Sequence, residues 1–573
     1  MKTRGDSLKI ASEQEFDLVV IGGGIVGAGV AQDAASRGLS VLLLEKGDFA
    51  SGTSSRTTKL IHGGLRYLEQ FQFRLTRELC QERGLLEQLA PHMIKDFSFI
   101  LPVCNDKKLF GLKAGVGLTI YDLLSLNARG VRRHQHLSLA ETVSAVPSLN
   151  ALRLSSGLRF HDCITDDSRV VMAVIKSACS FGALAINYLE ATGFQSADSD
   201  SRVDAVNCRD VLSGAEIVIR CRTCVNATGV WSDKLLSQID PAWRHRVKPA
   251  KGTHIILPSS SFETSTALFL PTDDGRYVFV VPWQNALMVG TTDISYDGPL
   301  DNPVATTEEV DYLLEVLNSY RNNIGGNGVA KPLCRADVVA AWAGLRPLVG
   351  DEKEDGESGQ TSNISREHSL FEGPSGIIGL IGGKLTNYRM LSSHVVDMAV
   401  VQLCRREPSY TTLPKSKTDN LMLGGWTDHA DFLATAEMVV VKGRTLGLSQ
   451  QTAQHLIANY GKDALHILAL VEQSPDLAEL ICLDFPAILA EVPYCLANEM
   501  AVTLDDMLSR RIRLGFVNQQ QCLQSAPKVA SLIGALCYWD GPRLALELDQ
   551  FQRGLLAQLA PIVSSPRSPP IEL

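Results

Sequence analysis

The stretch Phe16–Glu45, FDLVVIGGGIVGAGVAQDAASRGLSVLLLE, decides the fold of this chain. It begins with a short apolar run, which predicts a buried parallel strand. Gly22, Gly24 and Gly27 follow at once, a helical composition comes next, and a second apolar strand ends the stretch. A strand, a glycine-rich turn, a helix and a strand in this order are typical of a dinucleotide-binding βαβ unit.

Each key residue has a physical role in such a unit. Gly22 makes the tight turn, Gly24 lets the backbone approach a pyrophosphate, and Gly27 lets the helix pack closely on the strand. The helix N-terminus offers N–H groups and a positive dipole end to the phosphates. Glu45 is placed to accept hydrogen bonds from a ribose 2′-OH and to repel a 2′-phosphate. An ordinary glycine-rich turn needs none of these flanking elements, so we predict a bound adenine dinucleotide.

Two further strand-then-glycine units and one small-residue loop point to the same cofactor. Val225–Gly229 (VNATG) and Ile377–Lys384 (IIGLIGGK) each end an apolar run in glycine, and Ala50–Lys59 (ASGTSSRTTK) follows the βαβ unit. Because several separate units approach one cofactor, we expect FAD rather than NAD. The residues expected to contact it, besides those of the βαβ unit, are Ser51, Thr53, Ser54, Ser55, Thr228, Gly229, Gly382, Gly383, Lys384 and Thr386.

The composition is that of an ordinary globular protein in a reducing compartment. The chain has 573 residues, 45% hydrophobic and 20% charged, which is long enough for several domains. Its net charge of −9 favours no nucleic-acid partner. Cys221 and Cys224 form a C-x-x-C pair, for which redox or zinc chemistry is the alternative, but no second pair stands at metal-ligand spacing. We interpret both as strand-core cysteines and expect no metal.

The ends of the chain and its hydropathy predict a cytoplasmic protein. Residues 1–15 lack the apolar core of a secretory signal, and we interpret them as a loose leader. No apolar run approaches the roughly 18 residues that a transmembrane helix needs. Residues 564–573 (SSPRSPPIEL) have the composition of a disordered tail.

The segment Gly52–Glu69, GTSSRTTKLIHGGLRYLE, resembles the signature of FAD-dependent glycerol-3-phosphate dehydrogenases. The resemblance covers about residues 16–516 in the right order and is far more specific than a glycine fingerprint. Its further motifs are His161-Asp162, Asp166–Arg169, Asn226–Gly229, Lys251–His254, Gly290–Asp293, Gly344–Leu348, Gly382–Thr386, Glu499–Ala501 and Arg510-Arg511.

The resemblance implies an α/β architecture with the glutathione-reductase-type FAD-binding fold. The FAD-binding domain takes residues 16–400, in segments of about 16–100, 150–245 and 335–400. A β-rich substrate domain, at about 100–150 and 246–335, is interleaved with it. An all-α domain takes residues 401–563, where the pattern predicts helices from the cap Ser449 to Tyr460 and at 463–473, 492–513 and 530–547.

The resemblance also implies a reaction. It is the oxidation of sn-glycerol 3-phosphate to dihydroxyacetone phosphate, with electrons passed through FAD to a quinone at the inner face of the cell membrane. Arginine guanidinium groups bind a phosphate dianion well because they donate two parallel hydrogen bonds. The candidates are Arg66, Arg346 and Arg366, which lie in or beside the motifs. His254 is the first choice for proton acceptor because its ordinary pKa lies near neutrality. The alternative is a histidine that only hydrogen-bonds the substrate while water accepts the proton.

Lys384 and Tyr67 have two interpretations each, and His62 has one. Lys384 follows two glycines and either stabilises anionic reduced flavin or binds substrate, so we place it with His254 and Arg346 in the catalytic set. Tyr67 is a hydroxyl donor to the substrate or a packing residue. His62 shapes the loop near the flavin.

A basic-flanked apolar segment predicts peripheral association with a membrane surface. Ala114–Leu126 is the apolar run, although a core helix with solvated ends has the same pattern. The basic residues that flank it are Lys107, Lys108, Lys113, Arg129, Arg132, Arg133 and His134. A homodimer is left open.

Three other functions compete with this prediction. A D-amino-acid-oxidase-like or glycine-oxidase-like enzyme is disfavoured by the Gly52–Glu69 signature and by the long helical C-terminal region. A glycerol-3-phosphate oxidase that reduces O2 is not decided by the sequence. A flavin-binding sensor without catalysis is disfavoured by the presence of His254, Arg346 and Lys384.

Overall fold

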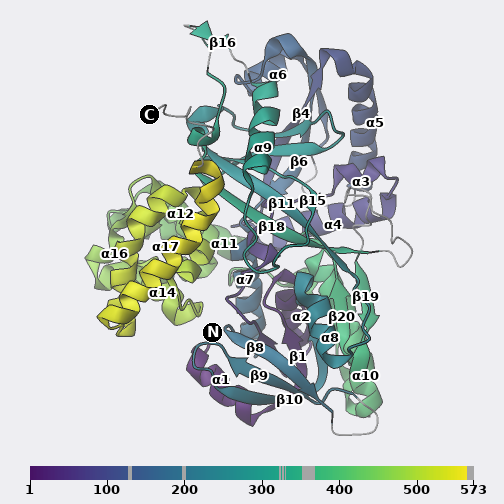
Figure 1. Cartoon of the computed structure of the whole chain (residues 1–573), viewed down its shortest axis with the longest axis vertical. Helices are drawn as coiled ribbons and strands as arrows, with labels where there is room; N and C mark the ends of the chain where they lie inside the picture. Colours follow the sequence, from purple (N-terminus) through teal and green to yellow (C-terminus); the bar gives the residue numbers. More distant parts are fainter. Residues whose placement is uncertain are drawn as a thin grey trace, which may run out of the picture.

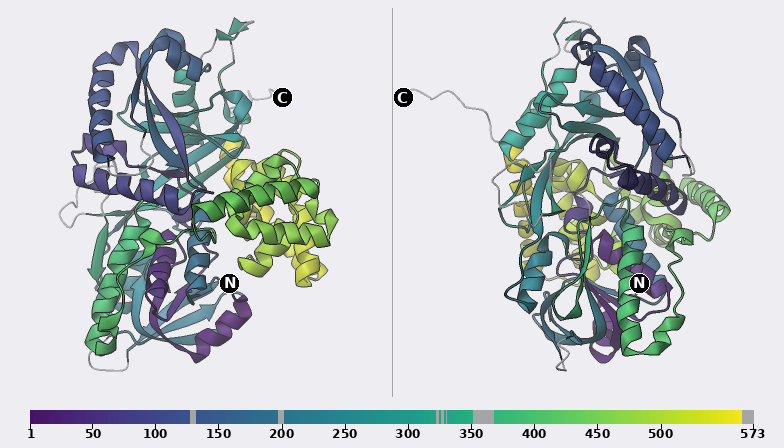
Figure 2. Two further views of the ribbon diagram at one scale, coloured as in Figure 1. Left: turned by 180° about the vertical axis from the view of Figure 1, so that it is seen from behind. Right: turned by 90° about the vertical axis from the view of Figure 1, so that its right-hand side faces the viewer.

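Two β-sheets lie one above the other along the long axis of the molecule, and a group of helices lies beside their junction (Figure 1). The computed structural model describes residues 1–126, 132–196, 202–321, 324–325, 328–329, 331–350 and 368–563. Figure 2 shows from behind that the helical group, coloured green to yellow, stands at the level where the two sheets meet.

The first sheet is built around the βαβ unit that the sequence predicted. Its central strands are parallel, with β1 between β2 and β10, and antiparallel strands extend it. In spatial order it contains β19 (Ser369–Glu372), β20 (Ile378–Ile381), β10 (Glu216–Asn226), β1 (Glu15–Ile21), β2 (Val41–Leu44) and β7 (Leu184–Ile186), with β9 (Ala205–Asp210) and β8 (Leu189–Gln195) added on β10.

Helix α2 (Ile25–Ser36) connects β1 to β2 and is buried along almost its whole length. Helices α7 (Asp167–Ser180) and α10 (Tyr388–Arg406) pack against it. A Cβ atom at Gly27 would lie 1.8 Å from the carbonyl oxygen of Gly22, so the helix approaches the turn more closely than any side chain permits. The predicted strand, turn, helix and strand are confirmed.

The second sheet is larger and mostly antiparallel. It runs in the order β15 (Ile294–Ser295), β11 (Val247–Pro258), β14 (Ala286–Gly290), β13 (Tyr277–Trp283), β12 (Ala267–Pro271), β4 (Lys95–Cys104), β6 (Leu154–Ile164) and β3 (Leu60–Ile61), with β18 (Ala340–Val349) on β11 and β5 (Gln135–Ser138) on β6. Strands β3, β6 and β18 come from segments that the sequence analysis gave to the FAD-binding domain. The second sheet therefore contains strands from segments that were expected in both domains.

Helices cover the outer parts of both sheets. Leucines of α9 and apolar residues of β11 and β14 share one hydrophobic core on the second sheet. The helices outside the C-terminal group, besides α2, α7 and α10, are α1 (Arg4–Glu13), α3 (Leu65–Glu69), α4 (Phe73–Leu89), α5 (Lys108–Leu124), α6 (Leu139–Ala145), α8 (Ser232–Ile239) and α9 (Thr307–Tyr320).

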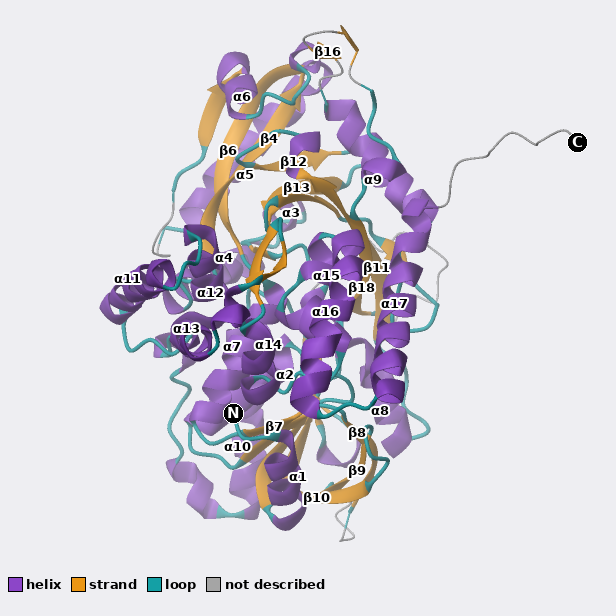
Figure 3. Cartoon of the chain, turned by 90° about the vertical axis from the view of Figure 1, so that its left-hand side faces the viewer, coloured by secondary structure: helices purple, strands orange, loops and turns teal. Residues whose placement is uncertain are grey.

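The C-terminal helices continue the hydrophobic core of the second sheet. Trp342 of β18 is fully buried and meets the ring of Phe516 at 5.1 Å between centroids. Figure 3 looks onto this group. It contains α11 (His429–Thr445), α12 (Gln450–Tyr460), α13 (Ala464–Gln473), α14 (Glu491–Asn498), a π-helical turn (Asp506–Arg511), α15 (Leu514–Val517), α16 (Gln519–Cys537), α17 (Gly541–Val563) and the hairpin β21 (Leu480–Cys482) and β22 (Phe485–Ile488).

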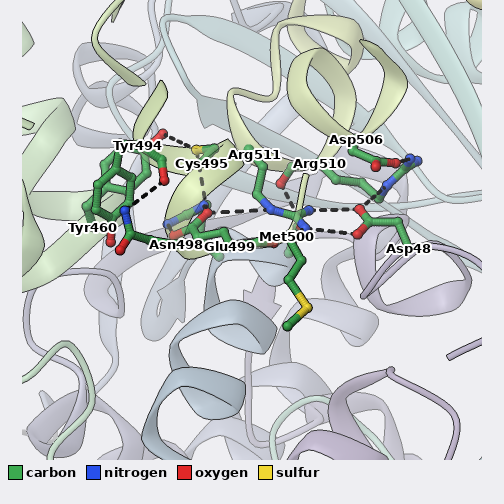
Figure 4. A network of polar contacts seen from close by, with 12 residues as sticks. Asp48, Tyr460, Tyr494, Cys495, Asn498, Glu499, Met500, Asp506, Arg510 and Arg511 are labelled. Atoms are coloured by element: carbon green, nitrogen blue, oxygen red, sulfur yellow. Dashed lines mark hydrogen bonds and ion pairs between the residues drawn. The ribbon is translucent and has the colours of Figure 1, made fainter. Parts of the chain in front are cut away.

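Buried ion pairs also join the helical group to the FAD-binding part (Figure 4). Arg511 donates to both carboxylate oxygens of Asp48, at 2.8 and 2.9 Å, and to the backbone oxygen of Glu499. The Glu499 carboxylate accepts two hydrogen bonds from Arg169 of α7, at 2.7 and 2.8 Å. These charges are almost completely removed from solvent.

Residues 1–15 are a correction to the sequence analysis. The expected loose leader contains α1, capped by the Thr3 hydroxyl, with Ser7 and Ala11 buried. Arg4 anchors the helix, because its guanidinium pairs with Asp210 and donates to the backbone oxygens of residues 187 and 188. These partners are far away in sequence, so local composition carries no sign of them.

The C-terminal helices are partly as predicted. Ser449 accepts a hydrogen bond from the Thr452 N–H and caps α12, as expected. The helix expected at 492–513 is instead α14, an irregular stretch and the π-helical turn. The helix expected at 530–547 is broken at Tyr538, which has φ of 55°. The expected tail, residues 564–573, lies outside the described residues.

The cysteine pair fits its prediction, and the strand that carries it belongs to a hairpin. Strands β9 and β10 pair antiparallel on either side of residues 211–215. Cys221 and Cys224 are buried in β10 among apolar side chains, so both are strand-core residues.

Candidate active site

Two adjoining cavities lie where the sheets meet. The first spans about 1260 Å³ and the second about 1620 Å³, including the space at their openings to solvent. Both open onto the same wall, which includes Thr53, Pro347 and the segment 382–385. A ligand that spans both therefore passes along the loop after β20.

The first cavity contains most of the predicted cofactor contacts. Its lining includes Gly22, Gly24, Glu45, Ser51, Thr53, Ser54, Thr228, Gly229, Gly382, Gly383 and Lys384. Gly27 and Ser55 do not line it. Gly27 lies at the contact between helix and turn, and the backbone oxygen of Ser55 accepts hydrogen bonds from Lys59 and Arg513.

Glu45 is held in place at the end of β2. Its carboxylate accepts the N–H groups of Gly23 at 2.7 Å and Gly47 at 2.8 Å. Burial raises the pKa of the carboxyl group above its usual value, and these two N–H groups oppose the rise. Each oxygen keeps a further lone pair, which suits a ribose hydroxyl.

The N-terminus of α2 faces the same cavity. Its cap residue Gly24 contributes no side-chain hydrogen bond, and the Ser54 hydroxyl accepts the N–H of Ile25 at 3.0 Å. Gly382 and Gly383, which line the same cavity, both have positive φ, of 84° and 90°. A helix dipole end in a cavity that is also lined by glycine backbone suits a pyrophosphate.

The second cavity brings together the predicted substrate residues. Arg66, Tyr67, His254, Arg346 and Lys384 all line it, although they come from distant parts of the chain. Thr386, which was expected at the cofactor, also lines this cavity and not the first. Thr386 hydrogen-bonds the backbone of His62 and so ties the two loops together. The Lys384 ammonium lies 4.3 Å from the centre of the Tyr67 ring. Arg366 lies outside the described residues.

Arg346 is held by its neighbours on the second sheet. Its guanidinium donates to Asp293 Oδ1 at 3.2 Å and to Thr291 Oγ1 at 3.1 Å. A Cβ atom at Gly252, on the paired strand β11, would lie 2.5 Å from Nη2. Glycine at this position therefore leaves room for the guanidinium.

His254 is fully enclosed at the cavity wall. Its ring stacks on Trp342 at 5.3 Å and 13°, and its Nε2 lies 3.0 Å from Thr58 Oγ1. Burial, with the cations Lys59 and Arg346 as lesser causes, holds the pKa of His254 well below its ordinary value. The imidazole is therefore neutral at physiological pH and able to accept a proton.

The comparisons with known proteins agree with this geometry. Residues 17–382 match the FAD dependent oxidoreductase family, and residues 416–544 match the C-terminal domain of alpha-glycerophosphate oxidase. Glycerol-3-phosphate dehydrogenase 2 of Mycobacterium tuberculosis is 34% identical over 97% of this chain and 91% of its own length. The chain belongs to the FAD-dependent glycerol-3-phosphate dehydrogenase family.

Further relatives extend the comparison. The human mitochondrial glycerol-3-phosphate dehydrogenase is 33% identical, over 96% of this chain and 75% of that protein. The crystal structure of the Bacillus halodurans glycerol-3-phosphate dehydrogenase, complexed with FAD, superposes with a TM-score of 0.79 and 27% identity, covering 99% of both chains. The cofactor of this chain is FAD, and the first cavity, with the N-terminus of α2 and Glu45 in its lining, fits an adenine dinucleotide.

Two residues of the second cavity, Arg276 and Thr58, were not predicted from the sequence of this dehydrogenase. Arg276 lines it from the turn before β13, where its Nε donates to Asp274 at 2.8 Å. Thr58 lines it beside His254. The turn Thr272–Arg276 (TDDGR) was a visible signal for the first, and the position of Thr58 within the family signature was a signal for the second.

Proposed function

We propose that this protein oxidises sn-glycerol 3-phosphate to dihydroxyacetone phosphate and passes the electrons to a quinone. The observation that most directly supports this proposal is that a neutral, buried His254 lines the same cavity as Arg66, Arg346 and Lys384. This cavity adjoins the one that is suited to FAD. The dehydrogenase names of the similar proteins support the substrate and the reaction.

The residues of the second cavity have different proposed roles in the reaction, according to their charge. The guanidinium groups of Arg66, Arg346 and Arg276 supply donors for a phosphate dianion, and Arg366 stays a prediction. His254 takes the proton of the secondary hydroxyl, and FAD would supply the acceptor for the hydride. Lys384 lies on the wall shared by both cavities, where a cation stabilises negative charge on substrate or reduced flavin.

Replacing Arg346 with alanine tests the phosphate assignment. We expect KM for glycerol 3-phosphate to rise by about 10–100-fold, as for a lost charge-assisted hydrogen bond, with a much smaller change in kcat. Steady-state assays with glycerol 3-phosphate and with glycerol measure this. Arg335→Ala, at a surface ion pair with Asp311, is the matched control. Loss of bound FAD in Arg346→Ala, with KM unchanged, would contradict the assignment.

The same assays identify the electron acceptor. A soluble quinone is expected to support turnover far better than O2. Hydrogen peroxide formed at a comparable rate would favour the oxidase alternative. The match to the C-terminal domain of alpha-glycerophosphate oxidase is a reason to test that alternative.

We also propose that the outer face of α5 docks on the inner face of the cell membrane. Leu109, Leu112, Val116 and Leu123 recur at helical spacing on this face and are all more than half exposed. Helices α3 and α4 pack beside α5, and the exposed Phe71 and Phe73 lie at the start of α4. Lys108 and Lys113 on α5 suit anionic headgroups. Among the described residues, no helix has the length and hydropathy needed to cross a bilayer.

Co-sedimentation with anionic liposomes at low salt tests this docking. The double variant Leu112→Glu with Val116→Glu is expected to lose binding, because it places two charges against the lipid. Leu483→Glu, at a residue 91% exposed on the β21–β22 hairpin, is the control and is expected to bind as the parent does. Equal binding of all three proteins would argue against α5 as the docking face. The homodimer stays a prediction.

A further inference from the structure

Gly63 and Gly64 turn the chain just before the helix that carries two residues of the second cavity. Gly64 has φ of 75° and precedes α3, from which Arg66 and Tyr67 line the cavity. A helix of five residues has little stability of its own, because a first turn fixes several backbone angles for a single hydrogen bond. The position of Arg66 therefore depends on the contacts that hold this glycine turn.

Two buried side chains from other elements hold the N–H group of Gly63. It donates to the hydroxyl of Tyr121, on α5, at 2.8 Å and to Asp162 Oδ1, near the end of β6, at 3.3 Å. A Cβ atom at Gly63 would lie 2.3 Å from the Tyr121 hydroxyl oxygen and 2.4 Å from Cys80 Sγ. Glycine therefore allows the backbone to approach close enough for the hydrogen bond to Tyr121.

The hydroxyl of Tyr121 is itself fixed in direction. It donates its proton to Asp162 Oδ1 at 2.6 Å, and Arg83 donates to the same carboxylate oxygen at 2.7 Å. Burial, with the charge of Asp162 as a lesser cause, raises the pKa of Tyr121 well above its ordinary value. The hydroxyl therefore keeps the proton that it donates to Asp162, and an oxygen lone pair accepts the Gly63 N–H.

The ring and the hydroxyl of Tyr121 act on different parts of this region. The ring lies in one small hydrophobic cluster with Cys80 and with Leu68 of α3. The hydroxyl holds the turn before α3 instead. A phenylalanine at this position keeps the packing of the ring and removes only the hydrogen bonds, so the two contributions can be separated by experiment.

We propose that Tyr121 is a positioning residue for substrate binding, and that its hydroxyl holds the Gly63–Gly64 turn so that Arg66 stays in place to bind the phosphate group. The inference rests on the proposed role of Arg66 in binding glycerol 3-phosphate. Tyr121 is not among the described residues that line the second cavity, so it acts through the turn and does not touch the substrate. Without the hydroxyl, the Gly63 N–H keeps only the longer hydrogen bond to Asp162.

The first test is Tyr121→Phe, studied as the holoenzyme in anaerobic reduction of the bound flavin by glycerol 3-phosphate. We expect the half-saturating substrate concentration to rise by about 3–30-fold, with the limiting rate within about twofold of the parent. Flavin content is expected to stay unchanged.

Tyr460→Phe is the matched control. Tyr460 is also buried, on α12 of the helical group, and its hydroxyl donates to the carboxylate of Glu491 at 2.6 Å. This variant loses the same kind of hydrogen bond, and its half-saturating concentration is expected to equal that of the parent. An equal rise in both variants, or no rise in Tyr121→Phe, would overturn the inference.

A double variant tests whether Tyr121 acts through Arg66. If it does, Tyr121→Phe combined with Arg66→Ala needs no more substrate for half-saturation than Arg66→Ala alone. Increases that multiply in the double variant would overturn the inference and leave the proposed function intact. An Arg66→Ala protein that half-saturates like the parent would overturn the proposed phosphate binding by Arg66, and the inference with it.

Discussion

Replacing His254 with asparagine lowers kcat for glycerol 3-phosphate by about 10²–10⁴-fold, the range that a general base contributes. Asparagine keeps a polar side chain beside Thr58 but accepts no proton at neutral pH. Flavin content stays close to that of the parent, because His254 lines the second cavity and not the first. Steady-state kinetics with flavin quantitation measure this. A fall of less than about tenfold would favour the alternative in which water accepts the proton.

The pH dependence of the parent enzyme follows from the same residue. The folded-state pKa of His254 is below the ordinary value of 6.5, chiefly because of burial. The neutral base is therefore present above that lowered pKa, and activity is lost only as the pH falls through it. The acidic limb of kcat/KM for His254 is expected below pH 6.5. An acidic limb at or above that pH, absent from His254→Asn, would contradict the assigned environment.

Replacing Glu499 with glutamine destabilises the fold by about 3–5 kcal/mol, the cost of breaking a buried ion pair on one side. The carboxylate is fully buried between Arg169, which it binds twice, and Arg511, so neutralising it leaves buried positive charge (Figure 4). These cations lower the pKa of Glu499 to about 2 against the opposing effect of burial. Its contribution is therefore present above the ordinary glutamate pKa and is lost as the pH falls towards 2.

Urea unfolding of the holoenzyme measures this loss. Glu437→Gln, at an exposed position on α11, is the matched control and is expected to change the free energy of unfolding by less than about 0.5 kcal/mol. If Glu499→Gln unfolds like the control, the ionic junction between the helical group and α7 contributes little to stability.

The elements with strong local patterns could be predicted from the sequence. The apolar runs and glycines of Phe16–Glu45 specify β1, α2 and β2 without help from distant residues. Much of the active site was also predictable, because its residues stand in motifs. The structure adds that Arg346 on β18 pairs across from Ala250 on β11, only four residues before His254.

What could not be predicted depends on partners far away in sequence. Helix α1 is anchored by Asp210, and the buried pair of Arg169 and Glu499 joins residues 330 positions apart. The local amino-acid composition does not show which distant residues will form such contacts. Thr58 was overlooked for the same reason, since its significance comes from His254, 196 residues later.

The most direct test of the proposed reaction is anaerobic titration of the purified holoenzyme with sn-glycerol 3-phosphate, following flavin absorbance at about 450 nm. Glycerol and D-alanine serve as controls for the phosphate and for an amino-acid substrate. We expect glycerol 3-phosphate alone to bleach the flavin, and a soluble quinone to restore the absorbance. A bound flavin that glycerol 3-phosphate leaves oxidised, or that D-alanine reduces, would contradict the proposed reaction.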